Sequence, residues 1–217
     1  MTFLIDVLFA ALVVVNLCLA GVGRLWGAVR LVAFQGVVIG LLPFVLTGEH
    51  ALIAVVNVLV KGVLLPVMLN YAIRKARTVR ELEPLVGFGK SVAIVFAVTL
   101  LSFRFAPETL AVAVSFATIA TGLFLIIARR KAITQVIGFL VFENGISIFA
   151  AGISMDYGLV VELGILLDVF VLVFILGIAV YEINRTFSSI DIDKLNRLGD
   201  TRFMHAHRSV DGKGVHA

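Results

Sequence analysis

The stretch ALIAVVNVLVKGVLLPVMLNYAI (residues 51–73) is apolar almost throughout, yet it carries a lysine, Lys61, near its centre. A run of this length can cross the roughly 30 Å hydrocarbon core of a bilayer as a helix. A charge at that depth costs roughly 2.5–3.5 kcal/mol on insertion scales, so such a residue usually faces a protein interior. The stretch therefore predicts a membrane helix whose charge has a partner or a function.

Two further apolar runs repeat this pattern. Glu143 lies near the middle of residues 133–154, and Asp168 lies within residues 159–182. When consecutive helices cross the membrane in alternating directions, Lys61, Glu143 and Asp168 fall at similar depths. Three such charges predict a polar line along which protons or other ions move. The alternative is that they form interhelical ion pairs that only fix the packing.

The composition agrees with a membrane protein. Of 217 residues, 61% are hydrophobic and 15% charged, which is more apolar surface than a soluble core can bury. We therefore predict an all-α integral membrane protein, and we expect the first run to be a retained helix because no basic residue precedes it. The seven predicted helices are 3–23, 29–47, 51–73, 88–105, 109–128, 133–154 and 159–182.

Lysine and arginine gather in alternate connections between these runs. The bases of the first, third and fifth connections are Arg24, Arg30, Arg74, Lys75, Arg77, Arg80, Lys90, Arg129, Arg130 and Lys131, and further bases follow residue 184. The connections on the opposite side hold only Arg104. This asymmetry predicts an N-terminus outside and a C-terminus in the cytoplasm. The net charge of +4 is thus a sign of topology, and we expect no nucleic-acid partner.

Uncharged polar residues accompany the intramembrane charges. Asn57 lies four residues before the lysine and Ser147 four after the glutamate, so each shares the face of its charge. Asn144 follows the glutamate, about 100° around the helix. Glu162 lies about one turn inside the outer end of the last run. It is either an entry or exit group or a carboxylate that reaches back to the interface.

Small residues and a proline predict local helix geometry. Gly138, Gly145 and Gly152 repeat every seven residues and make a stripe on which another helix can pack closely. Glu143 points to roughly the opposite side of that helix. Pro66 is expected to kink the helix of residues 51–73.

The chain has few residues for cofactor or metal chemistry. Cys18 is the only cysteine, so neither an internal disulfide nor a cysteine-based metal site can form. His205 and His207 are the only neighbouring histidines, and two ligands do not make a metal site. We predict no catalytic, metal-binding or cofactor-binding residues, and hence no enzyme activity of this chain alone.

The stretch RRKAITQVIGFLVFENGI (residues 129–146) resembles the central helix of the K-type subunit of respiratory complex I and of the C-type subunit of cation/proton antiporters. With four helices ahead of that module, the chain resembles hydrogenase-4 component E, a membrane subunit of group 4 hydrogenase and formate hydrogenlyase complexes. The motifs that carry the resemblance, in order, are LVKGVLLP (59–66), FENG (142–145), VELGILLDVFV (161–171) and SSIDIDKLNRL (188–198).

The resemblance implies an organisation and a set of partners. It divides the chain into an N-terminal membrane extension (1–106), a K-subunit-like three-helix module (107–183) and a cytoplasmic tail (184–217). The chain would lie in the cytoplasmic membrane of a prokaryote, beside antiporter-like membrane subunits. Peripheral hydrogenase subunits would carry the nickel–iron and iron–sulfur centres, and this chain would contribute no catalysis of its own.

The resemblance also implies roles for the charges. In an ungapped register the relay glutamate of the K-type subunit aligns with Leu140, one turn before Glu143, so the relay role passes to Glu143 by proximity. Asp168 is the nearest analogue of a second glutamate in the last helix, and Lys61 would be a charge switch. The alternatives are a purely structural anchor and a subunit of a cation/proton antiporter. The ion (proton or sodium), the electron donor and the kind of parent complex stay open.

Overall fold

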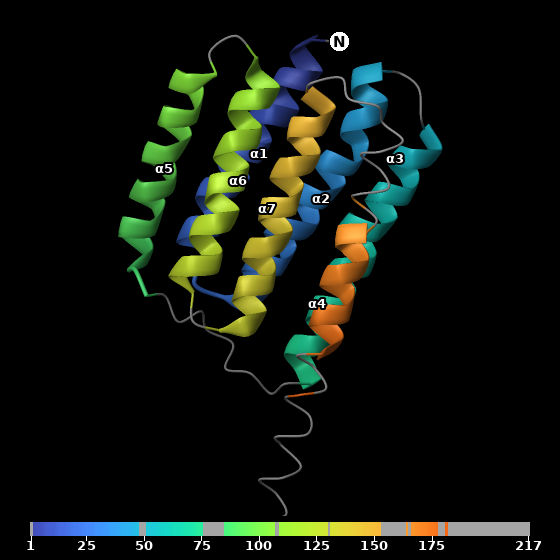
Figure 1. Ribbon diagram of the computed structural model, residues 1–217, viewed down its shortest axis with the longest axis vertical. Coiled ribbons are helices and arrows are strands. Elements are labelled where there is room, and N and C mark those ends of the chain that lie inside the picture. Colours follow the sequence, from blue (N-terminus) through green and yellow to red (C-terminus); the bar gives the residue numbers. More distant parts are fainter. Residues whose placement is uncertain are drawn as a thin grey trace, which may run out of the picture.

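The computed structural model describes residues 2–47, 51–75, 85–106, 109–129, 131–152, 164, 166–177 and 181, and these are helical apart from short connections. The helices, coloured along the chain in Figure 1, are α1 (Thr2–Gly21), α2 (Leu25–Thr47), α3 (Ala51–Asn57), the π-helix η1 (Val58–Leu64), α4 (Leu65–Lys75), α5 (Phe88–Phe105), α6 (Leu110–Ala128), α7 (Ala132–Gly152) and a shorter apolar helix, Leu166–Gly177.

Six of the helices are long and apolar enough to cross a membrane, with α3, η1 and α4 forming one of them. The prediction of an all-α membrane protein is confirmed at this level. The seventh predicted span, residues 159–182, lies partly outside the described residues, where the structure gives only the Leu166–Gly177 helix and two flanking positions. The count of seven stays a prediction.

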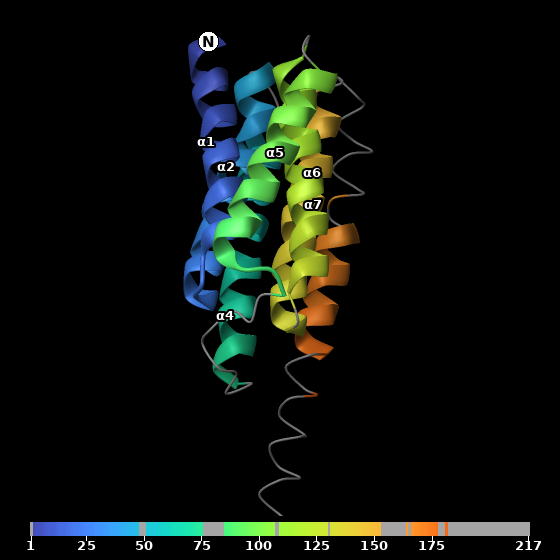
Figure 2. The ribbon, with the colours of Figure 1, turned by 90° about the vertical axis from the view of Figure 1, so that its left-hand side faces the viewer.

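Consecutive helices run antiparallel, and Figure 2 shows that α1 and α2 lie on one side of the bundle while α6 and α7 lie on the other. In Figure 1, α5 is at one lateral edge and the α3–η1–α4 helix at the other, beside Leu166–Gly177. The lower end in that view holds the α1–α2 and α6–α7 connections, the end of α4 and the start of α5. The bases Arg24, Arg74 and Lys131 therefore share this end.

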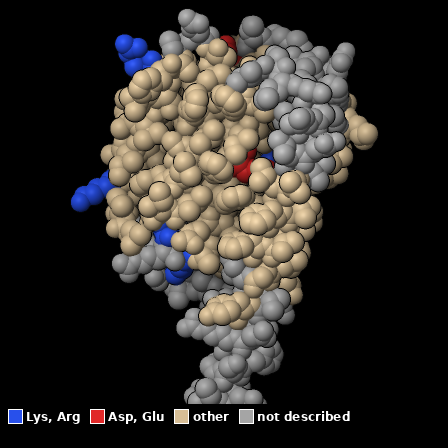
Figure 3. Space-filling model, in the orientation of Figure 1, with Lys and Arg blue, Asp and Glu red and all other residues tan. Residues whose placement is uncertain are grey.

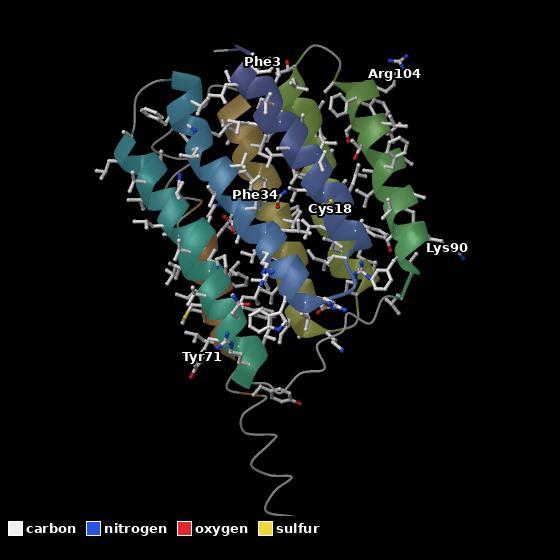
Figure 4. All side chains as sticks on the ribbon, turned by 180° about the vertical axis from the view of Figure 1, so that it is seen from behind. Phe3, Cys18, Phe34, Tyr71, Lys90 and Arg104 are labelled. Carbon is white, nitrogen blue, oxygen red and sulfur yellow. The ribbon has the colours of Figure 1, made fainter. Side chains whose placement is uncertain are left out.

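The outer surface is apolar, as a lipid-facing surface must be. Phe3, Leu52 and Ile127 are about three-quarters exposed or more. Seen from behind in Figure 4, Phe3 lies at the upper end, with Lys90 and Arg104 at the edge formed by α5. In Figure 3 the face formed by α6, α7 and the Leu166–Gly177 helix is tan over most of its area, with a small group of acidic and basic atoms at mid-height.

The glycine stripe of α7 packs against α6. A Cβ added at Gly145 would lie 2.6 Å from the backbone nitrogen of Ile119, and one added at Gly138 would lie 2.8 Å from that of Ile126. Gly122 of α6 meets the backbone of Phe142 in the same way. The prediction that another helix approaches along this stripe is confirmed, and there is no room for side chains where the two backbones meet.

A second close contact at glycines joins α2 to the π-helix that contains Lys61. A Cβ added at Gly36 of α2 would lie 2.7 Å from the carbonyl oxygen of Lys61, and one at Gly40 would lie 2.8 Å from the backbone nitrogen of Val58. The spacing of these two glycines is the small-xxx-small pattern of closely packed membrane helices. The π-helix is therefore held directly against the backbone of α2.

Candidate functional site

The structure brings Lys61, Glu143 and Asp168 together inside the bundle. The Nζ of Lys61 lies 2.5 Å from Oε1 of Glu143 and 4.0 Å from Oδ1 of Asp168. The residues are 7%, 1% and 5% exposed, so each has lost nearly all contact with its surroundings outside the protein. They come from η1, α7 and the Leu166–Gly177 helix. We call these three residues the charged cluster.

The lysine of the cluster lies in the middle of the π-helix. The Leu65 N–H donates to the carbonyl oxygen of Val60, five residues back, which is the hydrogen bond that defines this helix type. Pro66 follows directly and has no N–H to return to an α-helical pattern at its own position. The sequence predicted a kink at Pro66, whereas the structure places a wider helical turn just before it. Such π segments occur often at functional sites.

Ser147 completes the surroundings of the ammonium group. The Nζ of Lys61 donates to Oγ of Ser147 at 3.2 Å in addition to its bond with Glu143, and the Ser147 hydroxyl donates to the carbonyl oxygen of Glu143 at 3.2 Å. Ser147 thus lies on the same face of α7 as Glu143, as the four-residue spacing predicted. Two of the three donors of the ammonium group are occupied on α7.

Asp168 is the incompletely paired member of the cluster. Its Oδ1 is buried and accepts no hydrogen bond from the described residues, although it lies within ion-pair distance of Lys61. With all three groups ionised, one base would face two acids. The cluster is therefore able to bind a proton, and the lysine is within reach of either carboxylate. These are the properties needed to exchange protons inside a membrane.

Other residues proposed from the sequence lie elsewhere. Asn144 points away from the charged cluster and joins the hydrogen-bond chain described next. Asn57, half-buried at the end of α3, forms no hydrogen bond with the cluster in the described part of the chain. Glu162 lies outside the described residues.

A chain of uncharged polar side chains crosses the bundle from α7 to α6. Asn144 donates to Oε1 of Gln35 at 3.3 Å, Gln35 donates to Oδ1 of Asn16 at 3.0 Å, and Asn16 donates to Oγ1 of Thr118 at 2.8 Å. The Thr118 hydroxyl in turn donates to the carbonyl oxygen of Val114 at 2.7 Å. The four side chains are at most 3% exposed and come from four helices. We call them the amide chain.

Sequence reasoning found only Asn144 among the members of the amide chain. Asn16 lies in the last third of α1 and Gln35 near the middle of α2, each among apolar neighbours. A lone amide at bilayer depth is itself a signal, because a polar group in hydrocarbon needs a partner. Charges in apolar runs were singled out by this criterion, whereas the uncharged amides Asn16 and Gln35 were not.

Arg129 ties together one end of the bundle. Its Nη2 donates to the carbonyl oxygen of Ala20, in the last turn of α1, at 3.0 Å, and its guanidinium lies 5.2 Å from the ring centre of Phe88. A cation at a helix C-terminus also interacts favourably with the helix dipole. Burial lowers the pKa of Arg129 from its ordinary value. From its place among the basic residues we expected Arg129 to act on topology alone, and the structure adds a capping contact.

An apolar cavity of about 250 Å³ lies between α6, α7 and the Leu166–Gly177 helix. It is lined by Ile126, Gln135, Val136, Phe139, Phe170, Val171 and Phe174. The ring of Phe170 is tilted against that of Phe139, with centres 6.0 Å apart, and stacks on that of Phe174, with centres 6.4 Å apart. Within the described ranges, no group of three histidine, cysteine or acidic residues is placed to hold a metal ion.

Comparisons with known proteins yield a bacterial relative. The chain is 32% identical over 214 residues to "Uncharacterized protein Rv0085" of Mycobacterium tuberculosis, in a match that covers 92% of this chain and 97% of the relative. No protein-family model and no solved structure matches the chain. An identity at this level over almost the full length of both proteins reflects a common fold. The chain therefore belongs to the family of this mycobacterial protein.

Proposed function

We propose that this chain is a membrane subunit of a hydrogenase-4-like redox complex and that the charged cluster is its proton relay. Electron transfer in partner subunits would reorganise the cluster, and Glu143 would be the central relay, with Asp168 as its partner and Lys61 as the switch. The chain itself would hold no cofactor. The basic end of the bundle would face the cytoplasm, in the inner membrane of a prokaryote.

The observation that carries the proposal is the burial of Lys61, Glu143 and Asp168 against one another inside the bundle, with Lys61 and Glu143 near the middle of membrane-length helices and Asp168 on the shorter apolar helix beside them. Replacing buried ion pairs by well-packed apolar residues is often neutral or stabilising, so stability alone is a weak reason to keep them. Ionisable groups at this depth are most often parts of ion or proton pathways.

The geometry supports a simple exchange. In the structure Lys61 pairs directly with Glu143. A shift of the ammonium toward Asp168, now 4.0 Å away, would leave the Glu143 carboxylate without its partner and ready to take up a proton. Ser147 would keep one hydrogen bond to the ammonium during the movement. The side chain of lysine is long and flexible enough for such a shift.

Two further observations support the wider assignment. The sequence resembles hydrogenase-4 component E from residue 59 to residue 198, and two of the quoted motifs contribute Lys61 and Glu143. Asp168 belongs to a third motif. The bacterial relative agrees with a prokaryotic membrane.

A structural anchor is the second candidate, and the direct Lys61–Glu143 ion pair favours it. An ion pair between η1 and α7 would hold two helices together without any proton moving. The two functions differ in what they require of Glu143. A relay needs a group that gains and loses a proton, whereas an anchor needs only a hydrogen-bond partner for the lysine.

The test replaces Glu143 by glutamine in the intact complex and measures proton movement into membrane vesicles. We expect Glu143→Gln to abolish coupled proton transport while the subunits still assemble, because an amide accepts the lysine hydrogen bond but does not titrate. Asp6→Asn is the matched control, since Asp6 is an exposed carboxylate on α1. Normal transport in Glu143→Gln would overturn the relay.

The identity of the parent complex needs a separate experiment. The tagged protein is extracted in mild detergent, and its partners are identified by mass spectrometry together with a metal analysis. We expect antiporter-like subunits and a nickel–iron subunit. Antiporter-like partners without nickel would assign the chain to an antiporter instead, and no stable partner would overturn the assignment to a complex.

A further inference from the structure

The amide chain lies next to the charged cluster in the sequence but on another face of α7. Glu143 and Asn144 are neighbours, so their side chains leave the helix about 100° apart. Glu143 meets Lys61 of η1, and Asn144 meets Gln35 of α2. A hydrogen bond that fixes the direction of Asn144 therefore also restricts the direction of Glu143.

The orientation of every amide in the chain follows from Thr118. Its hydroxyl hydrogen goes to the carbonyl oxygen of Val114, so its oxygen can only accept from Asn16. Asn16 must then present its NH₂ to Thr118 and its oxygen to Gln35. Gln35 must in turn present its oxygen to Asn144. All the hydrogen bonds run in one direction, from α7 toward α6.

We propose that Thr118, Asn16, Gln35 and Asn144 are positioning residues, whose hydrogen-bond chain fixes the rotation of α7 and so holds Glu143 against Lys61. The proposal rests on the relay role of Glu143, because positioning matters only if that carboxylate acts. The amide chain contains no ionisable group. It sets the geometry of the charged cluster without taking part in proton exchange.

The ionisable groups around Glu143 allow the effect of the amide chain on this carboxyl group to be measured. Among the described residues, its ionisable neighbours are Lys61 on η1 and Asp168 on the Leu166–Gly177 helix. Of the other helices packed against α7, α6 has no ionisable residue and α2 has only Arg30, near its start. A change in the titration of Glu143 after a substitution on α6 would therefore come through the geometry and not through a new charge.

Two threonines of α6 provide a matched pair of substitutions. Thr118 and Thr121 are both fully buried, and each donates to the carbonyl oxygen four residues before it at 2.7 Å. Of the two, Thr118 accepts a hydrogen bond from Asn16. Valine has nearly the same shape as threonine, so Thr118→Val and Thr121→Val remove the same intrahelical bond. The two substitutions differ because Thr118→Val also removes the hydrogen-bond acceptor of Asn16, whereas Thr121 takes no part in the amide chain.

The experiment uses the full chain in lipid nanodiscs and follows the infrared band of the Glu143 carboxyl group as a function of pH. The band is identified by its loss in Glu143→Gln. We expect Thr118→Val to move the midpoint of this titration by about half a pH unit or more, which corresponds to one interhelical hydrogen bond in a membrane. We expect Thr121→Val to leave the midpoint in place and Thr118→Ser to restore it.

A merely structural role predicts a different result. Thr118→Val would then lower the melting temperature more than Thr121→Val does, while the Glu143 titration stayed the same in both, and this would overturn the proposal. The relay hypothesis fails separately, through normal proton transport in Glu143→Gln. If Thr118→Val and Thr121→Val titrate alike while Glu143→Gln is inactive, the positioning role is wrong and the relay stands.

Discussion

The charged cluster and the amide chain are both buried inside the helical bundle, and each includes one of two adjacent residues of α7. They differ in how completely their groups are paired. In the amide chain, Asn16, Gln35 and Thr118 each accept one hydrogen bond and donate another. In the charged cluster, Oδ1 of Asp168 accepts none among the described residues.

Because of this difference, the charged cluster is able to change its arrangement, whereas the amide chain keeps one arrangement. Turning the amide of Asn16 or Gln35 over would break both the hydrogen bond that it accepts and the one that it donates, so the amide chain has one stable arrangement. The charged cluster has two acids for one base, and so has at least two arrangements of its charges. The comparison predicts that substitutions in the amide chain act on geometry, whereas those in the cluster act on charge.

Removing the shared cation should have the largest effect on stability. Lys61→Met leaves two buried carboxyl groups facing each other without a base, and breaking a buried ion pair costs about 3–5 kcal/mol. We expect a corresponding fall in the free energy of unfolding, measured in mixed micelles. Lys90→Met is the control, because Lys90 is exposed at the start of α5. The double variant Lys61→Met/Glu143→Gln should recover part of the loss; no recovery would mean that the charges do not interact.

Interrupting the amide chain at its centre should have an intermediate effect. Gln35→Leu removes two interhelical hydrogen bonds and leaves Asn16 and Asn144 each without one partner, at a cost of roughly 1–3 kcal/mol. Thermal unfolding in detergent would measure the change. Gln135→Leu is the control on α7: this exposed glutamine donates one long hydrogen bond, of 3.4 Å, to the carbonyl oxygen of Arg129, so its loss should cost less than that of Gln35. Equal effects of the two substitutions would show that the hydrogen bonds of the amide chain do not stabilise the bundle.

Neutralising Asp168 should have the smallest effect on stability and a large one on transport. Asp168→Asn removes the surplus acid and leaves Lys61 and Glu143 as a balanced pair, so we expect a free energy of unfolding equal to or slightly above that of the parent protein. Proton movement into vesicles should nevertheless be lost. Retained transport together with unchanged stability would show that the cluster needs no second acid.

The charged cluster could largely be predicted from the sequence because charges in apolar runs are rare and need partners. Ser147 followed from its spacing to Glu143. The amide chain was missed because an uncharged amide in an apolar run stands out less than a charge, and the sequence does not show which of the scattered amides and hydroxyls pair with one another. The membrane class followed from hydropathy, and the glycine stripe of α7 from its seven-residue repeat. The π-helix left no sign in the sequence, because an i→i+5 segment within an apolar helix has no hydrophobic period of its own.

The π-helix has a consequence for how the chain tolerates insertion and deletion. A turn with i→i+5 bonds holds more residues than an α-helical turn, so η1 stores extra chain length between α3 and α4. Deleting Gly62 would remove the surplus residue, so that α-helical bonds could run from α3 into α4 while both present nearly the same faces as now. Winding all the residues of η1 as an α-helix would instead turn α4 by about 100° relative to α3. The place of Lys61 relative to α4 therefore depends on the π-helical bonding of η1 as well as on the identity of its residues.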